Sequence, residues 1–370
     1  MKFKFLINGY RLNQKNYHKI SILLLNQRIE KFNVTLDRQT SFPNENLFLM
    51  STPTHSKALS YLLRHGAQKE KVNIDDNGYI LYDDVIAWFK NKKHSLNYAD
   101  IQEIITSDKK NRYSFLSDPL RIRANQGHSM ELNIGLKEYT GTMKQFLHAS
   151  YMKHYDSISS VGLNRMSRTH IHMICPEIKY MSMIRQDTDL YVMVNYVKCK
   201  QLGIKFEISD NNVILSSNII PPSCLILIPA FNGKSGCYGI ILKAKDTQRY
   251  LMVQTFKDQL GFPKGKREKN ELPIACAFRE LEEETGIQSH LIELIPGNLA
   301  EINDNGSISV IYYQAFIESE FKSECDPTEL KQVKWYDVKE LLNCPLLLNR
   351  RKELLKSSSL NFDDSIKESS

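Results

Sequence analysis

The sequence predicts two folded domains of different class, an α+β domain followed by an α/β domain. The 370 residues, of which 42% are hydrophobic, are enough to bury two cores of ordinary size. Between residues 56 and 226 helical patterns come first and strand patterns later, whereas beyond residue 227 several strand patterns surround one Glu-rich helix. The two halves share no repeat, so we expect two unrelated domains.

Charge and cysteine content limit the classes of protein. The net charge is +7 and the 7 cysteines include no Cys-x-x-Cys pair, which argues against a disulfide framework or a structural zinc and favours a reducing compartment. No run of 18 apolar residues occurs, so we expect no membrane partner and a cytoplasmic or nuclear location. A basic charge attracts polyanions but is weak evidence for nucleic acid.

Residues 1–50 contain three acidic residues against eight Lys or Arg. We interpret them as a poorly structured extension, with mitochondrial targeting as the alternative, and place the start of the folded part at Met50. Translation starts at either Met1 or Met50, which the sequence does not decide.

Residues 51–130 predict a winged-helix lobe. The stretch 57–67 predicts a helix that ends at Gly66, and helices are also expected at 83–90, with an Asp N-cap, and at 99–105. Strands at 112–116 and 121–124 complete a hairpin. Three helices and a hairpin are typical of nucleic-acid-binding modules.

Several short motifs follow one another in an order that resembles the KptA-type, NAD-dependent RNA 2′-phosphotransferases. They are LLRH ending at His65, Arg112, RANQGHS at 123–129, FLHAS at 146–150 and SRTHIHM at 167–173. The resemblance covers about residues 56–226 and implies a catalytic tetrad of Arg64, His65, Arg112 and Arg168. Singly, each of these side chains would be read as a solvated charge or a helix cap.

The resemblance implies a reaction in two steps on RNA that carries an internal 2′-phosphate, with spliced tRNA as the default substrate. The phosphate attacks C1″ of NAD and expels nicotinamide, and the ribose 2″-hydroxyl then attacks the phosphodiester. The products are RNA with a free 2′-hydroxyl and ADP-ribose 1″,2″-cyclic phosphate. Arg forks and a His suit a site that grips a phosphate without a metal. Transfer of ADP-ribose to phosphorylated nucleic-acid ends, without the second step, is the alternative.

For residues 131–226 the resemblance implies an ADP-ribosyltransferase-like lobe with a split β-sheet that binds NAD. Its His-Gly-Thr motif stands here as His148-Ala149-Ser150, and His172 takes the second histidine position, with His170 expected on the same face. The Ala is a departure, because its Cβ limits close backbone approach. We interpret four side chains of the RANQGHS motif as contacts to the substrate phosphate: Arg123, Gln126, His128 and Ser129.

The second domain, residues 227–356, centres on the Glu-rich helix. Read as a helix from about Ile274, the stretch places Glu280, Glu283 and Glu284 on one face, where a hard divalent cation such as Mg²⁺ or Mn²⁺ would relieve their repulsion. Arg279 is expected to pair with Glu271. An exposed acidic helix with a Gly C-cap is the plain alternative.

The spacing of this stretch, from Gly265 through Glu271, Arg279 and Gly286 to Ile287, resembles the Nudix box at every defined position. The resemblance implies an α/β/α sandwich that hydrolyses a nucleoside diphosphate derivative, with Glu280, Glu283 and Glu284 as metal ligands and Glu283 as catalytic residue. Glu329 is the candidate fourth ligand and Glu301 the alternative.

The substrate of this domain stays open. Fusion to the first domain favours ADP-ribose 1″,2″-cyclic phosphate, whereas LGFPKGK at 260–266 resembles the loop of enzymes that act on capped RNA or dinucleoside polyphosphates. A domain that only binds a nucleotide is disfavoured by the intact carboxylates. Residues 357–370 are polar and Ser-rich, and we expect a disordered tail.

Overall fold

The structure, a computed structural model, describes residues 5–7, 10–12, 52–108, 110–230, 236–322 and 328–361. The chain divides into two units, Met1–Met50 and Ser51–Ser370. In the first unit, β1 (Phe5–Ile7) pairs antiparallel with β2 (Tyr10–Leu12). The rest of the predicted extension, most of the connection predicted at 230–236 and the end of the tail lie outside the described residues. Among the described helices, none is both long and apolar enough to cross a bilayer.

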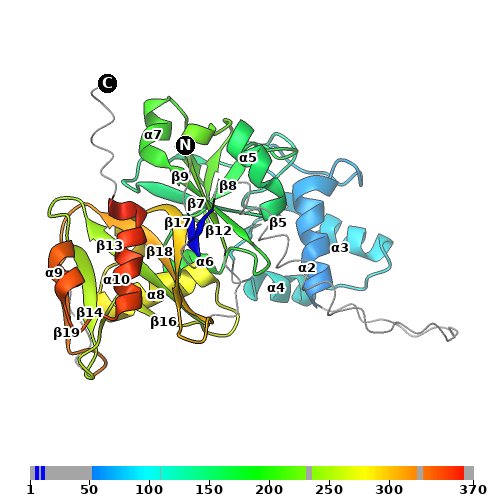
Figure 1. The fold of residues 1–370 in the computed structure, drawn as a ribbon. Helices are drawn as coiled ribbons and strands as arrows, with labels where there is room; N and C mark the ends of the chain where they lie inside the picture. Colours follow the sequence, from blue (N-terminus) through cyan, green and yellow to red (C-terminus); the bar gives the residue numbers. More distant parts are fainter. Residues whose placement is uncertain are drawn as a thin grey trace, which may run out of the picture. The chain divides into compact units, whose positions relative to one another are not determined.

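Residues 52–124 build three α-helices around one core, with a small antiparallel sheet of order β3-β5-β4 (Figure 1). The core joins Leu59, Leu62 and Leu63 to Trp88, Phe89 and Ile122. The elements are α2 (Thr52–Tyr61), the π-helical turn η1 (Leu62–Gly66), β3 (Ile80–Leu81), α3 (Tyr82–Asn91), α4 (Tyr98–Thr106), β4 (Tyr113–Ser117) and β5 (Leu120–Ala124).

One local prediction in this region is wrong. The N-cap of α3 is Leu81 rather than an Asp, and Asp83 and Asp84 lie in the first turn, where they interact favourably with the positive end of the helix dipole. The helix predicted to end at Gly66 does end there, although its last turn, from Leu62, is π-helical. By contrast, α4 has a capping box between Asn97 and Asp100, a signal that the sequence contains.

Residues 137–229 form two separate antiparallel sheets, of order β6-β10-β11-β8 and β12-β9-β7, which a bridge between Leu147 and Ile174 links. The strands are β6 (Lys137–Glu138), β7 (Gln145–Ser150), β8 (Ile171–Met173), β9 (Leu190–Asn195), β10 (Glu207–Ile208), β11 (Ile214–Ser216) and β12 (Leu225–Pro229). The helical elements are η2 (Met152–His154), α5 (Tyr155–Val161), α6 (Ile178–Met181), α7 (Tyr196–Gln201) and η3 (Pro222–Cys224). The boundary placed at 226/227 falls inside β12, whose whole length pairs with β9.

Residues 237–361 form a seven-stranded mixed sheet between helices. Its path is β15-β14-β13-β18-β17, with β16 beside β13 and β19 beside β14. The strands are β13 (Cys237–Ala244), β14 (Tyr250–Gln254), β15 (Leu260–Gly261), β16 (Lys264–Lys266), β17 (Ile292–Ile302), β18 (Ile308–Ile317) and β19 (Gln332–Tyr336). The helical elements are α8 (Pro273–Thr285), η4 (Ser289–Leu291), α9 (Val338–Asn343), α10 (Asn349–Ser357) and η5 (Ser359–Asn361).

Alternation along β13 shows that the sheet is covered on both faces. Ile240 and Leu242 pack in one core with α8, whereas Ile241, between them, packs in another core with Leu354 and Leu355 of α10. Adjacent residues of a strand point to opposite faces, so α8 and α10 lie on opposite sides of the sheet.

The predicted disordered tail is wrong for its first residues. Leu360 is only 1% exposed, and Ser358 Oγ donates to Gln314 Oε1 at 2.7 Å. An apolar Leu and a satisfied buried hydroxyl hold this stretch on the sheet despite its polar composition. Residues 362–370 lie outside the part that the structure describes.

Candidate functional site

The turn that carries Arg64 and His65 is π-helical. The Ala67 N–H donates to the Leu62 carbonyl, five residues back, at 3.1 Å. Leu62 and Leu63 are buried, while Arg64 and His65 point away from that core. Single π-helical turns often mark functional positions in helices. The extra residue in this turn is therefore a second signal for the site, which sequence reasoning missed.

Arg64 is a partly buried cation with unused hydrogen-bonding capacity. Its Nε and Nη2 atoms are buried and have no partner in the described structure. Gly127, with φ of +90°, packs beneath it, and a Cβ there would lie 3.4 Å from the Arg64 Cδ and Nε atoms. Burial, with Arg112 and Arg168 nearby, lowers the pKa of Arg64. Because an unpaired buried cation is costly, this arrangement fits an anion.

Arg112 is oriented by a carboxylate that the sequence analysis did not single out. Its Nε donates to Asp108 Oδ1 at 2.9 Å, its backbone N–H donates to Asp108 Oδ2 at 2.6 Å, and Nη2 donates to Ser56 Oγ at 3.1 Å. Asp108 is buried and lies four residues before Arg112. That spacing was the available signal.

A cavity of about 380 Å³ collects three of the four tetrad side chains, Arg64, Arg112 and Arg168. Residues 56–130 supply the first two, and the loop before β8 supplies Arg168. No hydrogen bond or ion pair of the Arg168 guanidinium is found among the described residues. His65 stands beside this cavity with Nδ1 3.2 Å from Ser129 Oγ, and partial burial, Arg64 and Arg168 lower the pKa of its imidazole.

The predicted NAD-binding residues divide in the structure. His148, Ala149 and His172 line the same cavity, and His148 Nδ1 lies 2.8 Å from the His172 carbonyl oxygen. Both ring nitrogens of His172 are buried and have no partner among the described residues, and burial, Arg168 and Arg64 hold its pKa well below the usual range. Ser150 is buried in β7 and is not among the residues that line the cavity.

The RANQGHS segment is also divided. Gln126 lines the large cavity, but Arg123 lies away from it: Nη2 donates to Asp210 at 3.1 Å and Nη1 to the Asn77 carbonyl at 3.3 Å. His128 is 2% exposed, and burial with Arg64 close by lowers its pKa to about 4. The structure thus uses Arg123 and His128 in packing, and Ser129 as the partner of His65.

His170 and His172 border different cavities, while the expectation that they lie on one face stays a prediction. His170, together with His128 and Thr169, borders a second cavity of about 270 Å³, and its Nε2 lies 3.2 Å from Glu207. Only His172 is part of strand β8. The two histidines border different cavities because His170 belongs to the loop that precedes the strand.

Polar residues that the sequence analysis did not select also line the large cavity: Lys110, Tyr151, Arg185, Thr188 and Asn211. Lys110 Nζ donates to the Met183 carbonyl at 3.2 Å, and Asn211 Nδ2 donates to the Lys110 carbonyl at 3.2 Å. These residues come from four loops, so neither spacing nor periodicity could have grouped them.

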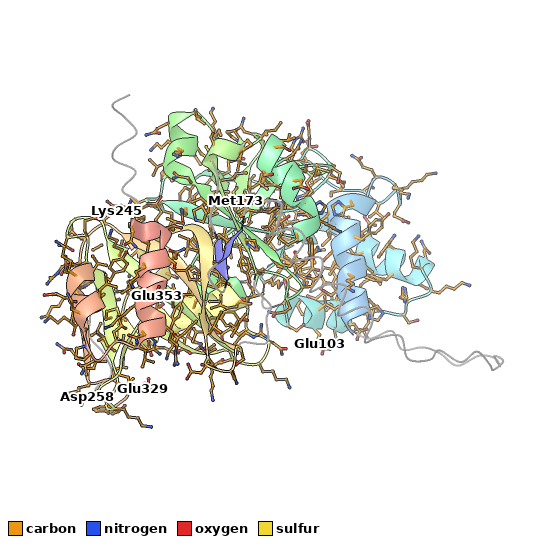
Figure 2. The ribbon with its side chains drawn as sticks, viewed as in Figure 1. Glu103, Met173, Lys245, Asp258, Glu329 and Glu353 are labelled. Atoms are coloured by element: carbon orange, nitrogen blue, oxygen red, sulfur yellow. The ribbon has the colours of Figure 1, made fainter. Side chains whose placement is uncertain are left out.

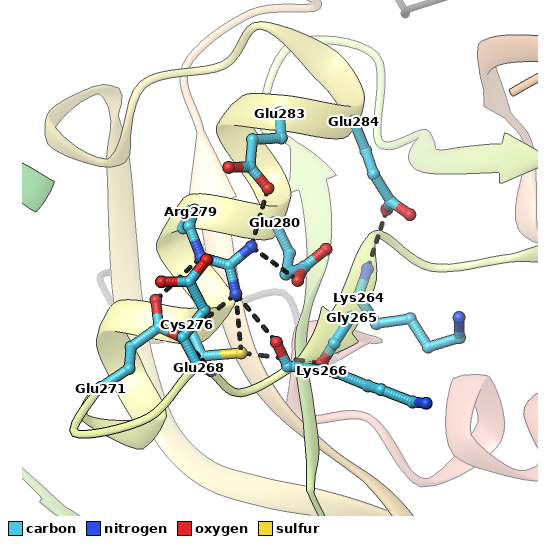
Figure 3. A network of polar contacts seen from close by, with 10 residues as sticks. All are labelled: Lys264, Gly265, Lys266, Glu268, Glu271, Cys276, Arg279, Glu280, Glu283 and Glu284. Atoms are coloured by element: carbon cyan, nitrogen blue, oxygen red, sulfur yellow. Dashed lines mark hydrogen bonds and ion pairs between the residues drawn. The ribbon is translucent and has the colours of Figure 1, made fainter. Parts of the chain in front are cut away.

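In the second half of the chain, α8 carries the acidic residues and ends at Gly286 in the left-handed conformation, with φ of 73°. Figure 3 shows Arg279 at the centre of a network between the helix and the preceding loop. Its Nε and Nη2 donate to the two carboxylate oxygens of Glu271 at 2.9 and 3.1 Å, which confirms the predicted pair. Its Nη1 donates to Glu280 at 2.8 Å and to Glu283 at 2.7 Å.

Gly265 lets the loop approach the helix closely (Figure 3). A Cβ at this position would lie 2.0 Å from the Glu280 carboxylate, so any larger residue would displace it. A hydrogen bond also joins the loop to the last turn of the helix, because the Lys264 N–H donates to Glu284 Oε2 at 2.9 Å.

The acidic side chains fit a hard divalent cation by their chemistry. Burial, with Glu280 and Glu329 nearby, raises the pKa of Glu284 to about 7, so a bound cation would favour its ionised form. The donors are oxygen atoms only, as Mg²⁺ and Mn²⁺ prefer. Within the described part of the chain, however, no three His, Cys, Asp or Glu side chains converge tightly enough to hold an ion. Arg279 draws Glu280 and Glu283 to itself instead.

The two candidates for the fourth ligand differ in their surroundings. Glu329 is exposed in the loop before β19 and near enough to raise the pKa of Glu284 (Figure 2). Glu301 is 1% exposed and accepts hydrogen bonds from Arg350, Arg351 and Tyr312. Its oxygens are occupied, so the structure favours Glu329.

The fold and the two sites define a two-domain α+β enzyme with a cationic cavity in its first domain and a carboxylate-bearing helix in its second. The sequence matches the RNA 2′-phosphotransferase, Tpt1 / KptA family over residues 51–218 and the NUDIX domain over residues 236–357. The chain belongs to this RNA 2′-phosphotransferase family and carries a NUDIX domain after the phosphotransferase domain.

Two relatives show the extent of the likeness. The chain is 37% identical over 173 residues to tRNA 2′-phosphotransferase 1 of Danio rerio, and this match covers 44% of this chain and 76% of that protein. It is 30% identical over 181 residues to a probable RNA 2′-phosphotransferase of Flavobacterium johnsoniae, covering 48% of this chain and 96% of that protein. A solved Ap4A hydrolase of C. elegans is 18% identical over 32% of this chain and 92% of that one, with a TM-score of 0.30, too low to support an argument.

Proposed function

We propose that the large cavity is where the RNA 2′-phosphate meets NAD. The observation that carries this proposal is the convergence of Arg64, Arg112 and Arg168 on one cavity, where two buried Arg64 nitrogens have no partner in the part of the chain that the structure describes. A phosphate would satisfy these donors. The remaining wall, with His148, Ala149 and His172, takes the ribose and nicotinamide of NAD.

The chemistry assigned to these residues follows from the charge that moves. In the first step a phosphate oxygen bonds to C1″ of NAD, and the bond from C1″ to nicotinamide breaks with its electron pair. In the second step the ribose 2″-oxygen bonds to phosphorus and the RNA 2′-oxygen leaves and takes a proton. The three arginines hold the phosphate through both steps, and His65, beside Ser129, exchanges the proton.

The proposal includes the finer architecture. Residues 51–130, with three helices and a three-stranded sheet, form a winged-helix lobe that holds the RNA. Residues 131–226, with two linked sheets, form an ADP-ribosyltransferase-like lobe that holds NAD. The similarity to tRNA 2′-phosphotransferase 1 of Danio rerio supports tRNA as the RNA.

For the second domain we assign Glu280, Glu283, Glu284 and Glu329 to Mg²⁺ or Mn²⁺. The metal, when bound, stabilises the charge of a pyrophosphate and lowers the pKa of a water molecule. Arg279 then keeps its bidentate contact to Glu271 and releases Glu280 and Glu283, which it contacts through Nη1 alone. The substrate we assign is ADP-ribose 1″,2″-cyclic phosphate, because the first domain makes this pyrophosphate within the same chain.

One assay tests both assignments. Full-length protein receives NAD and an RNA oligonucleotide with a radiolabelled internal 2′-phosphate, with and without Mg²⁺, alongside Arg168→Ala and Glu283→Gln. We expect label in ADP-ribose cyclic phosphate without metal, and in a smaller ribose phosphate with Mg²⁺ only while Glu283 is intact. Label that stops at the cyclic phosphate under both conditions would refute the Nudix substrate and leave capped RNA and dinucleoside polyphosphates to test. A stable ADP-ribosylated RNA end would instead show that the second transfer step is absent.

A further inference from the structure

Part of the wall of the large cavity is buried against the NUDIX domain. Leu147, Ile174 and Ile184 line the cavity, and the same three side chains are at most 6% exposed. They belong to one hydrophobic core with Ile274, Ala275, Cys276, Ala277, Phe278 and Leu281 of α8, the helix of the Nudix box. These apolar cavity residues and the buried face of α8 are therefore parts of one hydrophobic core.

A buried amide joins the two domains at strand level. Gln145, the first residue of β7, is 3% exposed. Its Oε1 accepts from the Leu294 N–H at 3.0 Å and its Nε2 donates to the Leu294 carbonyl at 3.1 Å, so that the side chain pairs with β17 as a neighbouring strand would. Three residues further along β7 lies His148, which borders the cavity. The start of this strand is thus held by the NUDIX domain.

A second element transmits the same support. Helix α6 packs against α8, with Met181 in the shared core. The chain that leaves α6 supplies Met183, Ile184, Arg185 and Thr188 to the cavity. This stretch has little regular structure of its own, so its position depends on what it packs against.

We infer that the NUDIX domain has a second role besides hydrolysis: it is the supporting wall of the NAD cavity, so that NAD binding in the first domain depends on packing against α8 and β17. This inference rests on the proposed placement of NAD in the large cavity. Its chemical content is specific. The support acts on β7, which carries His148, and on the stretch after α6, which we place on the NAD side of the cavity, so we expect it to affect NAD more than RNA.

The first test replaces Gln145 in the full-length chain. Gln145→Met keeps the length of the side chain but removes both hydrogen bonds to Leu294. We expect the KM for NAD to rise by roughly fivefold or more, with the KM for RNA and kcat within about twofold of wild type. The matched control is Lys144→Ala, the neighbouring residue, whose ion pair with Glu318 at 2.6 Å crosses the same boundary at its exposed rim. The control should leave all three constants unchanged.

The result that overturns the inference is a lower thermal midpoint for Gln145→Met with an unchanged KM for NAD. Gln145 would then only join the domains. If the wild-type protein has no phosphotransferase activity, the proposed function itself is refuted, and this outcome is distinct from the first.

The second test uses hydrogen exchange on the wild-type chain and does not depend on a variant that folds. NAD is added in EDTA and without RNA, so that neither active site turns over. We expect NAD to increase amide protection in residues 273–281 of α8 and 292–296 of β17 as well as in β7. His172→Ala, which alters the cavity, should abolish this effect. Protection confined to residues 51–230, or protection of α8 that persists in His172→Ala, would overturn the inference.

Discussion

The two sites of this protein treat concentrated charge in opposite ways. In the phosphotransferase cavity, two buried nitrogens of Arg64 have no partner among the described residues, whereas Arg112 is held by a carboxylate. In the Nudix box, Arg279 pairs with three of the four clustered carboxylates, and the fourth, Glu284, accepts from the Lys264 backbone N–H. The difference teaches that the cationic site is prepared for its anion, whereas the acidic site contains an internal cation that a metal must displace.

The largest expected effect separates the two sites outright. Arg168→Ala removes a guanidinium that has no other partner in the described residues, so we expect kcat/KM of the phosphotransferase to fall by roughly 10²–10³-fold. Mg²⁺-dependent pyrophosphate hydrolysis by the same protein should stay within twofold. Steady-state assays of both reactions measure this. Equal losses in the two reactions would show that Arg168 does not act in the phosphotransferase site alone.

Glu283→Gln is the matched change on the other side. Gln keeps the shape but cannot bind a divalent cation with charge, so we expect hydrolysis to fall by roughly 10²-fold while phosphate transfer is unchanged. Calorimetric titration with Mn²⁺ supplies a readout independent of activity and should show weaker binding. If Glu283→Gln hydrolyses at the wild-type rate, Glu283 is not a catalytic or metal-binding residue.

The third prediction concerns acid and the first domain alone. Burial lowers the pKa of His128 from 6.5 to about 4, so the unfolded chain binds a proton that the folded chain refuses. The stabilisation from neutral His128 is complete above pH 6.5 and is lost as pH falls towards 4, by up to about 3 kcal/mol. His128→Gln should flatten this loss in urea unfolding at pH 7 and pH 5. An unchanged slope in the variant would assign the acid sensitivity to other groups, such as His148 or His172, whose pKa values burial also lowers.

The smallest effect tests the one arginine that is held by a carboxylate. Asp108→Asn keeps the side-chain shape but removes the charge behind Arg112, and a hydrogen bond to a charged group contributes about 1.5–3 kcal/mol. We expect the KM for RNA to rise by roughly tenfold, with less change in the KM for NAD. Asp118→Asn, in the exposed turn between β4 and β5, is the control. A change in the KM for NAD alone would show that Arg112 contacts NAD rather than the RNA phosphate.

Much of the fold follows from local pattern. The strands expected at 112–116 and 121–124 form β4 and β5 at nearly those ends, and the Glu-rich stretch predicts α8 to within a residue. The pairing of Arg279 with Glu271 also follows from spacing, because both lie in one loop and helix. The prediction from composition is wrong for residues 357–361, since a polar sequence does not reveal that Leu360 packs in the core beside the sheet.

By itself the sequence determined the order of the domains and the spacing of the Nudix carboxylates, and it predicts the tetrad of Arg64, His65, Arg112 and Arg168. It also contained the four-residue spacing that lets Asp108 orient Arg112. Only the tertiary structure decided that Arg123 pairs with Asp210 and that Gln145 joins the two domains. Asp210 and Leu294 lie 87 and 149 residues from their partners, and pairing over such a distance is set by how whole elements pack, which no local pattern encodes.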